Sequence, residues 1–176
     1  MKIILYPLSL LYYCITLFRL WCYKYNVFTK HIFDIPIISV GNIAVGGTGK
    51  TPMTIYLAKL LTNKNINHVI VSRGYKKQST GTIVVNDGLG GGVASVKQCG
   101  DEPFFMAQKL PTTPIVVGSN KRAAIEVAIQ AFQPKIIILD DAFQSHYIDR
   151  TIDIVLFNCL EKEKNFHLFP TGSLRE

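Results

Sequence analysis

The sequence predicts an α/β fold, in which a mostly parallel sheet is flanked by helices and preceded by an apolar N-terminal helix. Short runs rich in Ile and Val alternate along the chain with longer segments in which apolar residues recur at helical spacing. Strands that alternate with helices are joined as parallel neighbours through right-handed crossovers. The chain also opens with an uncharged stretch, 3–18, that stands apart from this alternation. Its 176 residues suit one domain with an appendage.

The strands and helices are assigned from these runs in chain order. Apolar runs typical of buried strands occur at 35–40, 68–72 and 135–139, with further candidates at 114–117 and 152–157. A short run at 82–85 suits an edge strand. Apolar spacing predicts helices over 53–61 and 121–132, and Pro103 indicates the start of a helix over 104–110. Residues 86–100 are glycine-rich and predict a flexible loop.

The uncharged stretch predicts a helix over about residues 8–23. Its 16 uncharged residues fall short of the roughly 20 that span a bilayer core upright. Tyr12, Tyr13, Trp21 and Tyr23 have the amphipathic rings that favour a membrane interface. We favour a helix that lies in the inner leaflet, and the alternatives are a transmembrane anchor and a helix packed on the protein's own core. The predicted division is a membrane-associated helix in 1–30 and a nucleotide-binding lobe in 31–176.

The net charge of +7 is unevenly distributed. Four of the 19 Lys and Arg residues precede Asp34, in a stretch that contains no acid. Basic residues beside an apolar stretch suit attraction to an anionic leaflet, whereas a nucleic-acid-binding protein carries a basic stripe through its folded body. The expected partner is therefore the inner-membrane lipid surface and no nucleic acid. The four cysteines have no metal-ligand spacing and are expected to be reduced thiols.

The sharpest motif reads V-G-G-T-G-K-T at 45–51, between a predicted strand and a predicted helix. This is the context of a phosphate-binding P-loop, in which glycines and the helix N-terminus direct backbone N–H groups toward phosphate oxygens. In such a loop Lys50 binds the β- and γ-phosphates and Thr51 reaches Mg²⁺. An ordinary glycine-rich turn is the alternative. ATP and Mg²⁺ are the expected cofactors, and the expected phosphate-binding residues are Ala44, Val45, Gly46, Gly47, Thr48, Gly49, Lys50 and Thr51.

Two acidic motifs accompany this loop. Asp140 and Asp141 end a buried strand at the edge where such folds bind ligands, so one of them can hold Mg²⁺, and two solvated acids in a turn are the alternative. Asp101 begins a predicted helix, where it either caps that helix or deprotonates an attacking hydroxyl. Weaker candidates, each also explained by a solvated or structural role, are Arg73, Lys121, Arg122, Gln144, His146, Arg150 and Arg175.

These segments together resemble the tetraacyldisaccharide 4′-kinases of lipid A biosynthesis. Residues 40–52 read V-G-N-I-A-V-G-G-T-G-K-T-P and resemble that family's P-loop block, which also lacks the first glycine of the general pattern. Further blocks match in the family's order: R-G-Y at 73–75, G-D-E-P at 100–103, D-D-A-F-Q at 140–144 and L-F-P-T-G-S-L-R-E at 168–176. The resemblance covers essentially the whole chain.

The resemblance implies transfer of the γ-phosphate of ATP to the 4′-hydroxyl of tetraacyldisaccharide 1-phosphate, a lipid A precursor, to give lipid IVA. The expected place is the cytoplasmic face of the bacterial inner membrane. The implied catalytic residues are Asp101, which activates the hydroxyl, and Lys50. The resemblance further implies nucleotide contacts from Gln144 and Arg122, and a magnesium-nucleotide site made by Thr51, Glu102, Asp140 and Asp141.

Some positions depart from the family's pattern, and these are Ala142, Ser145, Thr151, Thr171 and Ser173. The chain also stops at Glu176, where the family continues into a second, smaller lobe that closes over the nucleotide. We therefore expect a truncated chain, either one whose second lobe is encoded separately or the product of a decayed gene. The alternative functions are another membrane-associated P-loop ATPase or GTPase and a catalytically incomplete nucleotide-binding fragment. The sequence lacks the guanine-specific N/T-K-x-D motif, which disfavours a GTPase.

Overall fold

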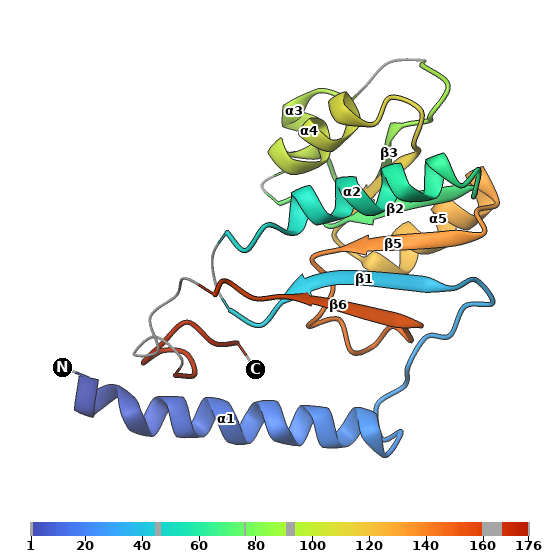
Figure 1. The fold of residues 1–176 in the computed structure, drawn as a ribbon. Helices are drawn as coiled ribbons and strands as arrows, with labels where there is room; N and C mark the ends of the chain where they lie inside the picture. Colours follow the sequence, from blue (N-terminus) through green and yellow to red (C-terminus); the bar gives the residue numbers. More distant parts are fainter. Residues whose placement is uncertain (1, 45–46, 76, 91–93, 160–166, 176) are drawn as a thin grey trace.

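The computed structural model describes residues 2–44, 47–75, 77–90, 94–159 and 167–175 (Figure 1). It confirms the α/β class, with helices on both faces of one sheet. The helices and strands follow in the order α1 (Lys2–Lys24), β1 (Ile37–Asn42), α2 (Lys50–Asn63), β2 (His68–Ser72), β3 (Thr82–Asn86), α3 (Val96–Cys99), α4 (Asp101–Lys109), β4 (Ile115–Gly118), α5 (Lys121–Phe132), β5 (Ile136–Asp140) and β6 (Ile152–Leu156).

The sheet has the strand order β3-β4-β2-β5-β1-β6. All neighbouring strands are parallel except β3 and β4, which are antiparallel. The edge position predicted for residues 82–85 is therefore confirmed. Because β1, β2 and β5 are parallel neighbours, their carboxyl ends meet at one edge of the sheet, where folds of this kind bind ligands.

The two faces of the sheet are covered by different helices. On one face, α2 and α4 pack over a core that includes Val40, Ile70 and Ile138. On the other face, α5 packs over a core that includes Val69 and Leu139. Neighbouring residues of one strand point to opposite faces, so the continuous apolar runs of the sequence supply both cores.

Three sequence-based boundaries were wrong. The N-terminal helix begins at Lys2 rather than near residue 8, with Pro7 inside it. The predicted flexible loop 86–100 contains the short helix α3, whose first turn is closed by a capping box between Ser95 and Gln98. The next helix begins at Asp101 rather than at residue 104, and Pro103 is therefore in its first turn, where the missing N–H costs nothing. All four cysteines are free thiols, as predicted.

Helix α1 turns a comparatively polar stripe toward the rest of the protein. Ser9 is buried, and its Oγ donates to Leu168 O at 3.2 Å and to Thr171 Oγ1 at 3.0 Å. The Tyr12 hydroxyl donates to Arg175 O at 2.8 Å. These contacts fasten α1 to the segment at the C-terminal end of the chain, close to the end of β1 (Figure 1).

The opposite side of α1 is apolar and faces outward. Within α1, residues 5–24 form a stretch of 20 residues that is long and apolar enough to cross a membrane, by length and composition alone. A helix on the surface of a soluble domain has the reverse arrangement, with its apolar side inward. The large exposed side chains of α1 are Tyr6, Leu8, Leu10, Leu11, Tyr13, Ile15, Leu17, Phe18 and Trp21.

Candidate functional site

The predicted P-loop connects the end of β1 to the start of α2. Asn42 and Ala44 are buried at its beginning, and Asn42 Nδ2 donates to Ala44 O at 2.6 Å. Gly49 precedes α2 with a φ of 83°, a conformation that favours glycine. A Cβ atom at Gly47 or at Gly49 would meet no atom within 4 Å, so the space beside both residues is open. Two further predicted phosphate contacts, Val45 and Gly46, lie outside the described residues.

The first residues of α2 face the acidic end of β5. Lys50 Nζ lies 3.6 Å from Asp141 Oδ1, and Thr51 follows Lys50 in the first turn. Asp141 Oδ1 and Thr48 Oγ1 are buried atoms without a hydrogen-bond partner among the described residues. Such atoms are costly unless a ligand satisfies them. The structure therefore brings Lys50 and Asp141 together, and Thr48 and Thr51 lie within two residues of Lys50 along the chain.

Asp140 is held rigidly behind this group. Its side chain is 1% exposed, and its two oxygens accept from different hydroxyls, Oδ1 from Thr54 Oγ1 at 3.2 Å and Oδ2 from Ser72 Oγ at 3.0 Å. Burial raises the pKa of Asp140 to about 6, while the Ser72 hydrogen bond acts in the opposite direction. Thr54 and Ser72 were not predicted as site residues. The carboxylate is thus fixed in position by α2 and β2.

A buried lysine lies beside the acidic pair. Lys121, the first residue of α5, donates from Nζ to Asp141 O and, at 3.2 Å, to Ser145 Oγ. Burial lowers the pKa of Lys121 to about 8, and the carboxylates of Asp141 and Asp140 oppose that shift. A pocket of about 340 Å³ opens over this lysine, and it is lined by Arg73, Ser119, Lys121, Asp141, Gln144, Ser145, Tyr147 and Arg175.

The structure places the neighbouring Arg122 elsewhere. Its guanidinium lies on the exposed side of α5, where Nε donates to Glu126 Oε1 at 2.8 Å. Adjacent helical residues point about 100° apart, so only one of the two basic residues can face the pocket. Lys121 shares its side of α5 with the buried Ala124 and Ala128, three and seven positions later. That spacing in the sequence could have identified Lys121 as the inward-facing cation.

Two hydrogen bonds to backbone carbonyls connect residues that line the pocket to the beginning of the P-loop. Gln144 Nε2 donates to Asn42 O at 2.8 Å, and the Arg175 N–H donates to Ile43 O at 2.7 Å. Ala44 also forms an isolated bridge with Leu174. Gln144, expected to contact the nucleotide, therefore holds the loop that would contact it.

Asp101 and Glu102 form the exposed first turn of α4, which packs against α2. Gly100 positions this turn with a φ of 91°, and a Cβ atom there would lie 2.6 Å from Tyr75 O. The Glu102 carboxylate adds to the rise in the pKa of Asp140, which places its charge within electrostatic range of the acidic pair. No described contact joins Asp101 to Lys50.

The donor set suits a magnesium ion that shares its coordination with a ligand. Among the described residues no group of three His, Cys, Asp or Glu side chains is close enough to hold a metal ion. Mg²⁺ usually takes one or two carboxylates and completes its shell with phosphate oxygens and water. Asp141 Oδ1, which accepts no hydrogen bond from the described residues, and the fixed Asp140 meet that need, and Thr51 follows Lys50 in the first turn of α2.

Comparison with known proteins identifies the family to which this chain is similar. Over residues 1–176 the chain matches the family described as LpxK, tetraacyldisaccharide-1-P 4′-kinase. Among similar curated proteins, the tetraacyldisaccharide 4′-kinase of Desulfotalea psychrophila is 41% identical over 172 residues, which are 97% of this chain and 49% of that protein. The corresponding kinase of Halothermothrix orenii is 42% identical over an alignment of 180 positions, which covers 99% of this chain and 46% of that protein.

A solved structure agrees. The crystal structure of LpxK from Aquifex aeolicus in complex with ATP matches with a TM-score of 0.88 and 38% identity, covering 99% of this chain and 54% of that one. The chain thus spans about half the length of the relatives it matches. The resemblance inferred from the sequence blocks is confirmed: the chain belongs to the tetraacyldisaccharide-1-P 4′-kinase family.

Proposed function

We propose that this chain binds ATP with Mg²⁺ and transfers the γ-phosphate to the 4′-hydroxyl of tetraacyldisaccharide 1-phosphate. The observation that carries the proposal is the pairing of Lys50 with Asp141 across the P-loop, beside the unpartnered Thr48 hydroxyl. Membership of the kinase family and the ATP bound to the Aquifex aeolicus relative support it. Because the chain spans about half of its relatives, the activity is proposed for this chain together with the half those relatives add.

In the proposed reaction the 4′-oxygen attacks the γ-phosphorus as the bond to the bridging oxygen of ADP breaks. The hydroxyl proton passes to the carboxylate of Asp101, and ADP leaves with the electron pair of the broken bond. Lys50 offsets the charge that develops on the phosphate oxygens, and the backbone N–H groups of the P-loop orient them. Lys121 adds a second cation from the pocket that Asp141 also lines.

Mg²⁺ would be held by Thr51, Asp140 and Asp141, with Glu102 close enough to add negative charge. When bound, it neutralises charge on the β- and γ-phosphates. The residues of this chain supply its position, since Thr54 and Ser72 fix Asp140 and the start of α2 presents Thr51. Arg122 points away from this group, so the proposed nucleotide contact from Arg122 has no geometric support.

The proposal is tested with Lys50→Met and, as a control, Lys59→Met, which removes an exposed lysine from the same helix. Isothermal titration calorimetry should show Mg-ATP binding to the unaltered chain and to the control, and a loss of at least about tenfold for Lys50→Met. Transfer of labelled γ-phosphate to the acceptor in detergent is measured in parallel. Equal ATP affinity for all three proteins would overturn the proposal. Binding without transfer would support the nucleotide site and show that turnover requires the portion that the relatives carry beyond the matched half.

We infer further that residues 1–30 associate with a membrane and that residues 31–176 form the nucleotide-binding lobe. The outward apolar side of α1 supports this, because its large side chains would otherwise face water. The proposed place is the cytoplasmic face of the inner membrane, where ATP is available. The double variant Leu10→Gln and Phe18→Gln should lower sedimentation with neutral phosphatidylcholine vesicles at least tenfold. Unchanged sedimentation would contradict the inference.

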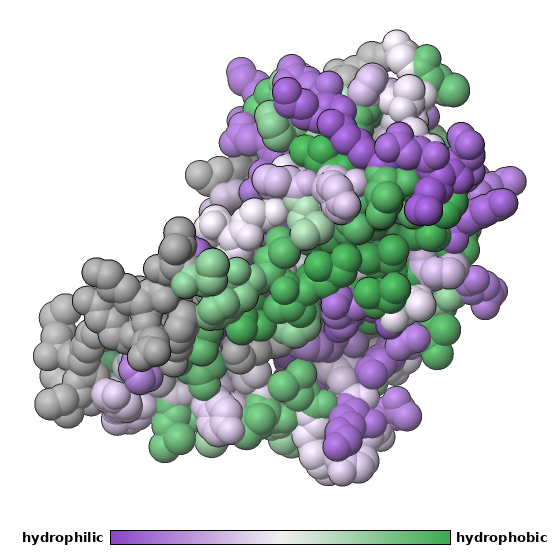
Figure 2. Space-filling model, viewed as in Figure 1, coloured by the Kyte–Doolittle hydropathy of each residue, from purple (hydrophilic) through white to green (hydrophobic). Residues whose placement is uncertain are grey.

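We infer that the portion that the relatives carry beyond the matched half covers the sheet edge formed by β6. On the α2 side, Ile38, Ile152 and Ile154 are half-buried or exposed, and Figure 2 shows apolar surface there. We infer that the partner bound by this apolar surface is the portion that the relatives carry beyond the matched half. Ile152→Glu should abolish capture of that portion of the Aquifex aeolicus relative, whereas Val84→Glu, at the opposite sheet edge, should not. Equal capture by both variants would contradict this.

A further inference from the structure

A second cavity lies at the far end of α1. Its volume is about 390 Å³, and it separates the last turn of α1 from the segment that leads into β6. Its lining and that of the pocket over Lys121 have no residue in common among those described. The charged and polar groups that line it come from three separate parts of the chain, and they are Lys24, Lys30, His146, Asp149, Arg150 and Asp153.

The charges of this cavity do not cancel in pairs. Arg150 Nε lies 3.1 Å from Asp153 Oδ1, and its Nη1 also donates to two backbone carbonyls, so this pair is fixed and locally neutral. Lys24 and Lys30 form no ion pair within the part of the chain that the structure describes. Lys24 Nζ lies over the ring of Tyr25, 5.7 Å from its centre, which leaves its charge uncompensated by a carboxylate. Apart from the Arg150–Asp153 pair, the lining has two lysines, Lys24 and Lys30, and one carboxylate, that of Asp149. The cavity therefore keeps a positive charge.

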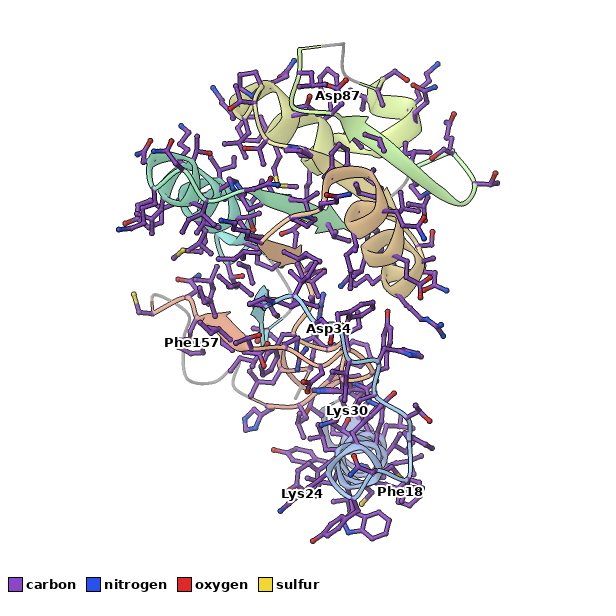
Figure 3. The ribbon with its side chains drawn as sticks, turned by 90° about the vertical axis from the view of Figure 1, so that its right-hand side faces the viewer. Phe18, Lys24, Lys30, Asp34, Asp87 and Phe157 are labelled. Carbon is purple, nitrogen blue, oxygen red and sulfur yellow. The ribbon has the colours of Figure 1, made fainter. Side chains whose placement is uncertain are left out.

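The cavity adjoins the apolar side of α1. Trp21 and Tyr25 are 51% and 58% exposed next to Lys24. Aromatic rings of this kind settle at the headgroup level of a bilayer, and lysine side chains beside them extend toward lipid phosphates. Figure 3 views α1 end-on and shows Lys30 between the helix and the sheet, with Lys24 and Phe18 on opposite flanks of the helix. The two lysines would thus lie at the phosphate level of a membrane that α1 contacts.

The cavity and the pocket over Lys121 have separate linings, and Lys24 lies far along α1 from the contact of Tyr12 with Arg175. Tyr12 contacts Arg175, whose backbone N–H donates to Ile43 O, directly after β1. Lys24 lies 12 positions further along the same helix, a rise of about 18 Å at 1.5 Å per residue. A group bound between the two lysines is therefore distinct from the phosphate that is transferred.

We propose that this cavity binds the phosphate group of a membrane lipid, with Lys24 and Lys30 as the residues that attract it. Two lipids present the required chemistry. One is an anionic phospholipid of the surrounding leaflet, and the other is the acceptor lipid through its 1-phosphate. The first source depends only on the membrane contact of α1, whereas the second rests on the proposed function.

The test measures binding of the purified chain to vesicles without ATP. The vesicles are phosphatidylcholine alone, or phosphatidylcholine doped to equal surface charge with phosphatidylglycerol or with tetraacyldisaccharide 1-phosphate. Lys24→Gln/Lys30→Gln removes the two cations. A relocated-charge variant adds Val27→Lys and Thr29→Lys to these changes, which restores the net charge at two exposed positions outside the cavity lining. Far-UV circular dichroism confirms that both variants are folded.

At about fivefold per lysine, the double variant should bind its doped vesicles roughly 25-fold more weakly, with binding to neutral vesicles unchanged. The relocated charges should not restore the loss. A loss confined to phosphatidylglycerol assigns a phospholipid, a loss confined to the acceptor lipid assigns its 1-phosphate, and a loss on both means that either phosphate is accepted. Restoration by the relocated charges, or no loss on either vesicle, overturns the proposal. ATP affinity is untouched by all of these outcomes, so failure here is distinguishable from failure of the proposed kinase.

Discussion

Thr54→Val tests how strongly the acidic end of β5 depends on helix α2. Valine has nearly the shape of threonine, so the change removes the hydroxyl that donates to Asp140 Oδ1 at 3.2 Å and leaves the packing in place. At pH 8 the Asp140 carboxylate is ionised, because its pKa is about 6. A hydrogen bond to a charged group contributes about 1.5–3 kcal/mol, and at 1% exposure no water replaces the lost donor. We expect the free energy of unfolding to fall by about 2 kcal/mol.

Thr62→Val is the matched control, because it makes the same substitution two turns later in the same helix. The Thr62 hydroxyl donates only to Ala58 O, within the helix, at 3.0 Å. Urea unfolding at pH 8, followed by circular dichroism in a mild detergent, measures both variants. The control should change the unfolding free energy by less than about 0.5 kcal/mol. If Thr54→Val costs no more than Thr62→Val, the idea that the hydroxyl supports a buried carboxylate is wrong.

Three further outcomes are expected. Lys121→Met should weaken Mg-ATP binding at least about tenfold and Arg122→Met less than twofold, because only the first cation faces the pocket; calorimetry giving equal losses would refute this. Gly41→Ala should cost about 1–3 kcal/mol in urea unfolding, because the new Cβ would lie 2.5 Å from Phe143 Cβ, and an unchanged midpoint would count against it. Burial lowers the pKa of His68, so the unfolded state binds more protons than the folded state below about pH 6.5, and the free energy of unfolding decreases as the pH decreases. His68→Asn should flatten this dependence between pH 7 and 5 in urea unfolding. Parallel slopes for the variant and the unaltered chain would disprove the assignment.

The strands, the P-loop and the acidic pair could be predicted because their signals are local. A run such as I-I-I-L-D-D fixes a buried strand and its acidic end without reference to any other segment. The hydroxyls that hold Asp140 could not be found in this way. Thr54 and Ser72 are separated from it by 86 and 68 positions, and nothing in their own neighbourhoods distinguishes them from solvated hydroxyls.

Helix orientation explains the other gap between sequence and structure. Lys121 and Arg122 are adjacent and equally basic, so their difference depends on which side of α5 packs on the sheet. The length of α1 was underestimated because Pro7 suggested a helix start, whereas five residues of α1 precede it. The inward polar stripe of α1 also depends on contacts with residues 168–175, at the opposite end of the chain.

Helix α1 and the predicted P-loop are held by the same residues. Arg175 accepts from Tyr12 through its carbonyl and donates its N–H to Ile43 O, while Arg19 donates to Gln144 O at 3.4 Å and the Gln144 amide donates to Asn42 O. Each path consists of two hydrogen bonds in series, and a neutral hydrogen bond contributes about 1 kcal/mol. A path cannot transmit more free energy than its weakest contact. If α1 docks on a membrane as proposed, these paths can change the affinity of the proposed nucleotide site by about fivefold each. The geometry of the loop itself would then determine most of the binding.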